Sequence, residues 1–144
     1  MLNLRYVGKN LYIGKLSVAN IAKKSGTPFY LYSENQIREN YIKFVNTFRK
    51  IDPLVCFAAK SNSNLSILKS LGKLGAGMDV VSGGELLKAL KAGIKANKIV
   101  FSGVGKTEEE LKIAINKKIL LINCESESEA RIINKIAKRS NRKV

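Results

Sequence analysis

The fold prediction starts from one stretch, Leu54-Val-Cys-Phe-Ala-Ala-Lys60-Ser-Asn-Ser-Asn64. Six residues without a charge end in a single lysine, and small polar residues follow it. This pattern predicts a buried strand over 54–59 that carries the Lys60 amine out into a site. Because burial disfavours a charged amine, Lys60 is a candidate for forming a Schiff base with a carbonyl compound. The alternative is an ordinary lysine at a strand end, one of twenty in the chain.

The same alternation of an apolar strand and an amphipathic helix repeats from this stretch to the end of the chain. Strands are predicted over 54–59, 77–82, 98–102 and 119–124, each followed by a helix with apolar residues at helical spacing. Apolar strands that alternate with helices predict an α/β fold with a parallel sheet covered by helices. The spacing fits a βα barrel and a doubly wound sheet equally, and the chain supplies about four βα units, roughly half of a barrel.

The residues before this repeat follow a different pattern. A hairpin is predicted over 6–12, and a short helix is predicted between a cap at Ser17 and a stop at Gly26. A further strand is predicted over 27–32. Ser33 then begins a longer helix through a capping-box pattern. The sequence therefore predicts a short β-containing N-terminal segment.

Polar residues stand at the end of each predicted parallel strand. Because the carboxyl ends of parallel strands meet at one edge of a sheet, where α/β folds keep their sites, we expect these residues to gather there. They are Lys60, Ser61 and Asn62, then Ser82, Ser102 and Glu125.

Asp79 is one of only two aspartates and lies inside the apolar strand predicted over 77–82. A carboxylate inside a parallel strand needs a partner, because its desolvation is costly. The neighbouring strand offers one cation, Lys60, so an ion pair that orients the lysine is one interpretation. The other is that Asp79 lies at a solvated strand start.

Two glycine-rich turns resemble nucleotide-binding motifs, and each lacks a required glycine. In the turn at 102–107 the first glycine of a P-loop is replaced by Val100, so a helix cap at Thr107 is favoured. In the turn at 75–77 the third glycine of a dinucleotide fingerprint is replaced by Val80. The sequence Ser82-Gly-Gly-Glu85 fits an anion site at a helix N-terminus and a capping box equally well.

The composition excludes several kinds of chemistry. With no histidine and two cysteines that lie in apolar runs, the chain offers neither a zinc site nor Ser-His or Cys-His catalysis. The net charge of +15 suggests a polyanion, but the lysines are scattered, so we expect no nucleic-acid partner. No apolar run is long enough for a membrane span and the start lacks a signal-peptide pattern, so we expect a cytoplasmic protein.

Assembled, these motifs resemble the diaminopimelate decarboxylases, a family that uses pyridoxal phosphate in lysine biosynthesis. The resemblance rests on Phe57-Ala-Ala-Lys60-Ser-Asn-Ser-Asn-Leu65, Gly77-Met-Asp-Val-Val-Ser-Gly-Gly-Glu-Leu86, Ile99-Val-Phe-Ser-Gly-Val-Gly-Lys-Thr107 and Asn123-Cys-Glu-Ser126. It covers nearly the whole chain. Ser61 departs from the family, which usually has alanine there.

The resemblance implies a pyridoxal-phosphate-binding βα barrel with a second, β-rich domain. Residues 1–32 would associate with that second domain, and 33–144 would form the first half of the barrel. Lys60 would be the catalytic lysine that holds the cofactor, with Asp79 beside it. The reaction would be the decarboxylation of meso-2,6-diaminopimelate to L-lysine, by a full-length homodimer.

Other features of the family come later in its chain, so we expect these 144 residues alone to be inactive. Two alternatives stay open at this point. One is a pyridoxal-phosphate enzyme that acts on another basic amino acid, such as ornithine or arginine. The other is a basic binding module without catalytic activity.

Overall fold

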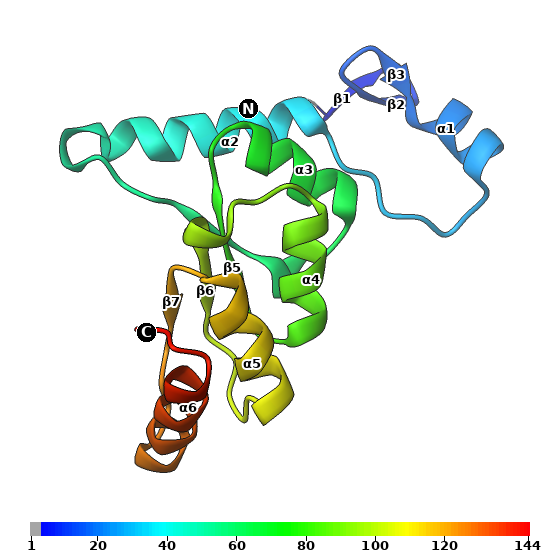
Figure 1. Cartoon of the computed structure of the whole chain (residues 1–144). Coiled ribbons are helices and arrows are strands. Elements are labelled where there is room, and N and C mark those ends of the chain that lie inside the picture. Colours follow the sequence, from blue (N-terminus) through cyan, green and yellow to red (C-terminus); the bar gives the residue numbers. More distant parts are fainter. Residues whose placement is uncertain (1–3) are drawn as a thin grey trace. The chain divides into compact units, whose positions relative to one another are not determined.

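The computed structural model describes residues 4–144 and shows two compact units, 1–44 and 45–144, which are considered separately (Figure 1). The first three residues of the predicted segment 1–32 lie outside the described part. The predicted division between 1–32 and 33–144 concerns association with a second domain, and it remains a prediction.

The N-terminal unit begins with a small antiparallel sheet. Its strands are β1 (Leu4–Val7), β2 (Asn10–Ile13) and β3 (Leu16–Ser17), and the hairpin between β1 and β2 turns at Gly8 as predicted. Helix α1 (Val18–Ser25) follows. Ser17 Oγ accepts a hydrogen bond of 3.4 Å from the Asn20 amide, and the helix ends at Gly26, whose φ is 74°. Both sequence signals for this helix are therefore confirmed.

The strand predicted over 27–32 is not formed. An extended segment becomes a strand only when its backbone pairs with a neighbour, and no described strand pairs with these residues. Tyr30 is accordingly 90% exposed. Helix α2 (Glu34–Thr47) then begins at the predicted cap, where Ser33 Oγ accepts a hydrogen bond of 3.3 Å from the Gln36 amide.

The C-terminal unit holds one parallel sheet with its strands in sequence order. The strands are β4 (Cys56–Ala58), β5 (Gly77–Val80), β6 (Ile99–Phe101) and β7 (Leu121–Ile122). The helices that follow them are α3 (Leu65–Lys73), α4 (Gly83–Lys91), α5 (Glu108–Lys117) and α6 (Glu127–Arg139). Single turns of 3-10 helix occur at η1 (Arg49–Ile51), η2 (Ala59–Ser61) and η3 (Ala96–Lys98).

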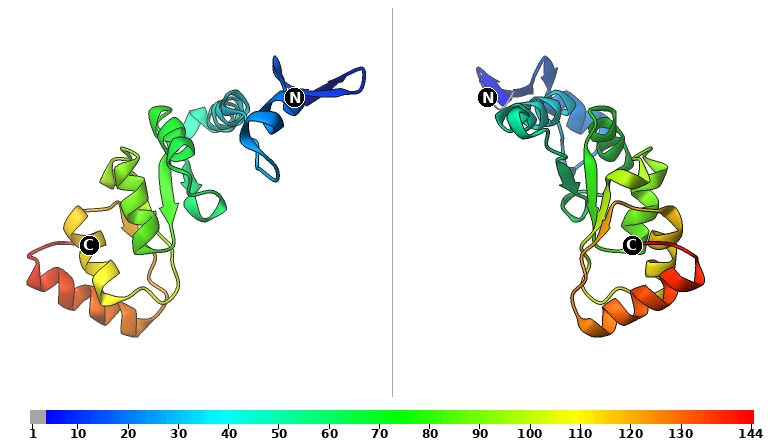
Figure 2. Two further views of the ribbon diagram at one scale, coloured as in Figure 1. Left: turned by 90° about the vertical axis from the view of Figure 1, so that its right-hand side faces the viewer. Right: turned by 60° about the vertical axis from the view of Figure 1, so that its left-hand side comes forward.

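This order separates the two folds that the sequence left open. A doubly wound sheet reverses its strand order at a switch point and carries helices on both faces. Here each strand pairs with the next along the chain, and Figure 2 shows α4, α5 and α6 on the same side of the strands. The predicted fold, the first part of a βα barrel with about four βα units, is therefore confirmed.

The two faces of this sheet differ in burial. The face toward the helices carries Met78, Val80, Ile99 and Phe101, all with 0% exposure. The opposite face carries residues that are only partly covered, among them Cys56, Ala58, Asp79, Val100 and Leu121. Apolar burial against the helices is thus the main source of stability. The opposite face, called the open face below, is partly exposed.

The helices pack through the apolar faces that the sequence predicted. Leu111, Ile115 and Ile136 form a buried cluster between α5 and α6, and Ile122 of β7 packs against it. Each parallel strand is shorter than predicted: β5 loses residues at its end only, and β4, β6 and β7 lose residues at both ends. Among residues 4–144, no helix is long and apolar enough to cross a membrane.

Candidate active site at the carboxyl edge of the sheet

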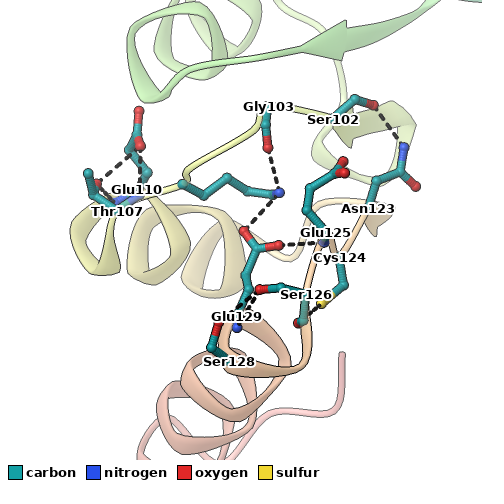
Figure 3. Close-up of polar contacts among 11 residues, drawn as sticks. Ser102, Gly103, Thr107, Glu110, Asn123, Cys124, Glu125, Ser126, Ser128 and Glu129 are labelled. Atoms are coloured by element: carbon teal, nitrogen blue, oxygen red, sulfur yellow. Dashed lines mark hydrogen bonds and ion pairs between the residues drawn. The ribbon is translucent and has the colours of Figure 1, made fainter.

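Four loops leave the carboxyl ends of the parallel strands and lie at the same edge of the sheet. Lys60 follows β4, Ser82 follows β5, Ser102 follows β6 and Glu125 follows β7, so the structure brings the predicted polar residues to one edge. The last two loops are joined directly. Asn123 Nδ2 donates a hydrogen bond of 2.9 Å to Ser102 Oγ (Figure 3).

Lys60 lies in the 3-10 turn η2, directly after β4. The Ser61 hydroxyl donates a hydrogen bond of 2.7 Å to the Ala58 carbonyl, and the Asn62 amide donates one of 3.1 Å to the Ala59 carbonyl. Ala59 is fully buried, whereas Lys60 is exposed. The turn therefore anchors the backbone beside Lys60 and leaves its side chain accessible. The expected burial of this lysine is not found, because Lys60 is exposed within the described residues.

Asp79 lies on that open face, where it pairs with Ala58 of β4 and Val100 of β6. Its Oδ1 atom is buried and has no hydrogen-bonding partner among the described residues. Burial raises the pKa of the Cys56 thiol on the same face, and the charge of Asp79 raises it further. A buried carboxylate oxygen without a donor is unusual, and it marks a position where a ligand can supply one.

The predicted ion pair between Lys60 and Asp79 is not formed. Within residues 45–144, the ion pairs join Lys106 to Glu129, Lys112 to Glu108 and Glu109, and Arg131 to Glu127. The physical reason is the turn η2, since the chain leaves the extended conformation after Ala58. The register of the parallel strands independently places Ala58, and not Lys60, opposite Asp79.

The Ser82-Gly-Gly-Glu85 segment is a helix cap. Ser82 Oγ accepts a hydrogen bond of 3.2 Å from the Glu85 amide, and Glu85 Oε2 accepts one of 2.9 Å from the Val81 amide. The Gly83 amide donates a hydrogen bond of 2.7 Å to Glu110 Oε1. Since a protein carboxylate already occupies the Gly83 amide, the capping interpretation holds and the anion site is not needed.

The turn over 102–107 is also a cap, and Figure 3 shows its contacts. Thr107 Oγ1 accepts a hydrogen bond of 3.2 Å from the Glu110 amide, while Glu110 Oε2 accepts one of 3.0 Å from the Thr107 amide. Hydrogen bonds from the Gly83 amide, and then from the Thr107 amide, hold the pKa of Glu110 below its ordinary value. Glu110 therefore joins the starts of α4 and α5, and the preference for a cap over a P-loop is confirmed.

Sequence reasoning missed one feature of this edge, the buried ion pair between Lys106 and Glu129. Glu129 is predicted correctly as part of the cap of α6, because Ser126 Oγ accepts a hydrogen bond of 3.2 Å from its amide. Lys106 carries no comparable signal, since a lysine between a loop glycine and a helix cap is usually solvated. Only the packing of the two loops reveals its burial.

Comparison with known proteins places the chain in a family. Residues 34–144 match the family model of the pyridoxal-dependent decarboxylase, pyridoxal binding domain. The chain belongs to the pyridoxal-dependent decarboxylases. Among curated relatives, the diaminopimelate decarboxylase of Aquifex aeolicus (strain VF5) is 45% identical over 140 residues, which are 97% of this chain and 33% of the relative.

Solved structures of such decarboxylases share the fold. A crystal structure of an Aquifex aeolicus protein is 44% identical, with a TM-score of 0.95, and the match covers 99% of this chain and 35% of that chain. The diaminopimelate decarboxylase from M. jannaschii in co-complex with L-lysine is 37% identical, with a TM-score of 0.93, covering 96% of this chain and 33% of that chain. The chain thus spans about a third of the length of these relatives.

Two features of the carboxyl edge suit the pyridoxal cofactor of the decarboxylase family. An accessible primary amine at Lys60 can bond to an aldehyde carbon. The buried Asp79 Oδ1, which lacks a donor, can accept a hydrogen bond or face a positive charge. Among residues 4–144, no cluster of histidine, cysteine or acidic residues could hold a metal. The residues present therefore fit an organic carbonyl cofactor.

Proposed function

We propose that this chain forms the pyridoxal-binding part of a diaminopimelate decarboxylase, which converts meso-2,6-diaminopimelate to L-lysine and CO2. The observation that carries the proposal is the accessible amine of Lys60 at the carboxyl edge of the half-barrel. The choice of substrate is supported by relatives named diaminopimelate decarboxylase, at 42–50% identity. A lysine decarboxylase structure from Selenomonas ruminantium is only 28% identical, which disfavours the alternative of an enzyme that acts on another basic amino acid.

In this proposal Lys60 is the catalytic residue that holds the cofactor. Lys60 Nζ, once deprotonated, would hold pyridoxal phosphate through its aldehyde carbon, with the carbonyl oxygen leaving as water. The chemistry of the bound cofactor is that of an electron sink, which takes up the electron pair left when CO2 departs. The turn η2 contributes by fixing the backbone on both sides of Lys60.

Asp79 has a different role in the same site. A carboxylate on the open face of the sheet favours a positively charged group nearby, such as a protonated substrate amine. We assign it to cofactor binding because its Oδ1 is buried without a donor among residues 4–144. The ligand would supply the missing partner.

Borohydride trapping tests the role of Lys60. The 144-residue chain is incubated with pyridoxal phosphate, reduced, digested and mapped by mass spectrometry. We expect labelling to be concentrated on Lys60 and lost in Lys60→Ala. Lys88→Ala is the matched control, because Lys88 is also exposed but bonds to Ser63 Oγ at 3.0 Å. Labelling spread evenly over many lysines would favour the basic binding module instead.

A chimera tests the choice of substrate. These 144 residues replace the matching third of the Aquifex aeolicus relative, with which they share 45% identity. We expect the chimera to release CO2 from meso-diaminopimelate at a rate within about tenfold of the parent, and to lose the activity with Lys60→Ala. A chimera that preferred ornithine or arginine would overturn the substrate and leave the cofactor role intact.

Three further properties belong to the same proposal. Residues 1–32 would associate with a β-rich second domain, the complete enzyme would be a homodimer, and it would act in the cytoplasm. The free cysteines Cys56 and Cys124 fit a reducing compartment. Light scattering of the chimera tests the oligomeric state, and a monomer with full activity would contradict the dimer.

A further inference from the structure

Lys106 is buried, although its position between a loop glycine and a helix cap predicts a solvated side chain. Among the residues that the structure describes, Lys106 and Glu129 are the two charged or polar residues that are buried. The Lys106 side chain is 0% exposed. A buried charge requires compensation from partners, so the contacts of Lys106 call for a functional explanation.

The ammonium of Lys106 has three neighbours. Its Nζ donates a hydrogen bond of 2.6 Å to the Gly103 carbonyl and lies 2.9 Å from Glu129 Oε1. The latter contact is an ion pair without hydrogen-bonding alignment, since Oε1 has no hydrogen-bonding partner. The centre of the Phe101 ring is 5.8 Å away, within reach of a cation–π attraction. One cation thus contacts its own loop, strand β6 and helix α6.

The contact with Gly103 lies where the β6–α5 loop packs against the end of strand β5. A Cβ atom at Gly103 would overlap the carbonyl group of Val81, so the loop backbone packs directly on the end of β5. The Ser102 amide continues this attachment, because it donates a hydrogen bond of 2.8 Å to the Val80 carbonyl. Lys106 therefore secures the loop at the point where Ser102 leaves the strand.

The contact with Glu129 extends to the next loop. Glu129 Oε2 accepts a hydrogen bond of 2.7 Å from the Glu125 amide (Figure 3). Burial by itself would raise the pKa of Glu129, but this hydrogen bond and the Lys106 ammonium outweigh it and hold the pKa below its ordinary value. The carboxylate therefore stays charged and binds both the lysine and the loop after β7. That loop carries Asn123, the partner of Ser102.

We propose that Lys106 is a positioning residue of the carboxyl edge. Through Gly103 and Glu129 it ties the β6–α5 loop to the β7–α6 loop, and it thereby fixes the Ser102–Asn123 pair at the edge that carries the proposed cofactor site. Only the effect on that site rests on the proposed function, because the tie between the loops is independent of any ligand.

If Lys106 had a purely structural role, its replacement would affect stability and leave the labelling of Lys60 unchanged. A buried ion pair can often be replaced by uncharged residues of similar size without loss of stability. The double variant Lys106→Met/Glu129→Gln makes such a replacement, because the amide oxygen that it introduces at position 129 still accepts the hydrogen bond from Glu125. It removes the tie between the loops and leaves no unpaired charge.

The test compares this double variant with the unchanged 144-residue chain by amide hydrogen exchange and by borohydride labelling with pyridoxal phosphate. We expect exchange to rise together at 103–107 and at 123–125, by roughly tenfold, while the Gly83 amide, held by Glu110, keeps its protection. We expect labelling of Lys60 to slow several-fold. Lys112→Met is the control, because Lys112 is an exposed lysine of α5 and should change neither readout.

Two results would overturn the proposal. One is unchanged exchange in either loop, and the other is normal labelling of Lys60 when both loops have become mobile. Absence of Lys60 labelling in the unchanged chain would instead refute the proposed function. The exchange data would still show whether Lys106 connects the two loops. Should the double variant not fold, Asn123→Ala removes the exposed partner of Ser102 directly, and normal labelling there would count against the proposal.

Discussion

Asp79 shows, at the scale of a single residue, why a pattern in the sequence can identify a site and misjudge its contacts. The pattern marked a carboxylate inside an apolar strand, and the structure places it on the open face with a buried oxygen that has no donor among residues 4–144. The strand register places Ala58 opposite Asp79, and its expected partner, Lys60, lies in the 3-10 turn that follows. A carboxylate left in this condition lowers stability and is available to a ligand.

Asp79→Asn separates these two effects. Because the change removes a partly buried charge whose Oδ1 has no hydrogen-bonding partner within residues 4–144, we expect the free energy of unfolding to stay the same or rise by about 1 kcal/mol. We expect labelling of Lys60 by pyridoxal phosphate to slow several-fold at the same time. Urea titration and the trapping assay measure the two quantities. A clear fall in stability would show that Asp79 has a structural partner.

At the scale of the elements, loops rather than strands organise the carboxyl edge. The parallel strands have only two to four residues, whereas the loops after β5, β6 and β7 are bound by carboxylates of the helices that follow. Glu85 binds the Val81 amide, Glu110 binds Gly83 and Thr107, and Glu129 binds Glu125. Glu85 and Glu129 thus bind the loop directly before their own helix, and Glu110 also joins two successive βα units through the Gly83 amide.

Glu110→Gln tests this role through pH. The pKa of Glu110 in the folded chain is below its ordinary value of 4.5, so its contribution is fully present above that value and is lost as the pH falls through the folded-state pKa. We expect the variant to be about 1 kcal/mol less stable at pH 7 and to lose less stability than the unchanged chain between pH 5 and pH 3. Urea titrations across this range measure both effects. Glu109→Gln, a change at a neighbouring exposed carboxylate, should leave the pH profile unaltered.

Gly103→Ala tests the packing of the β6–α5 loop on β5. The added methyl group would meet the backbone of Val81, which cannot rotate away, and we expect a loss of about 1–3 kcal/mol in the free energy of unfolding. Gly84→Ala is the matched control, because the only atom near its Cβ is Ser82 Oγ at 3.8 Å. Thermal or urea unfolding compares the two. Equal stabilities would contradict the close approach of the loops.

At the scale of the whole molecule, the chain has the lysine that we propose to hold the cofactor but only part of a barrel. It spans about a third of the length of its relatives, and the face of the sheet that carries Asp79 is only partly covered within residues 4–144. Water therefore reaches Lys60 and the strand residues beside Asp79. Decarboxylation requires an enclosed site in which charges act in a low dielectric, and the described residues leave this one open.

We therefore expect the 144-residue chain to bind pyridoxal phosphate at Lys60 without decarboxylating meso-diaminopimelate at an enzymatic rate. Release of labelled CO2 measures the reaction, and borohydride trapping on the same sample confirms that the cofactor is attached. The chimera with the Aquifex aeolicus relative is the positive control. A rate from the isolated chain within about tenfold of the chimera would contradict this prediction.

The sequence by itself determined the α/β class, the four βα units, the helix caps and the polar residues at the strand ends. These follow from hydrophobic periodicity and local hydrogen bonding, which act between residues close together in the chain. It also supplied the resemblance that the family match bears out. It failed at residues 27–32, because an extended segment becomes a strand only if a distant partner is present.

Only the tertiary structure decided between a barrel-type and a doubly wound sheet, because strand order is set by packing between units and not by their spacing. It also decided that Lys60 is exposed, that Asp79 Oδ1 has no hydrogen-bonding partner within residues 4–144, and that Lys106 is buried against Glu129. Burial and ion pairing depend on which distant segments meet. No local pattern contains that information.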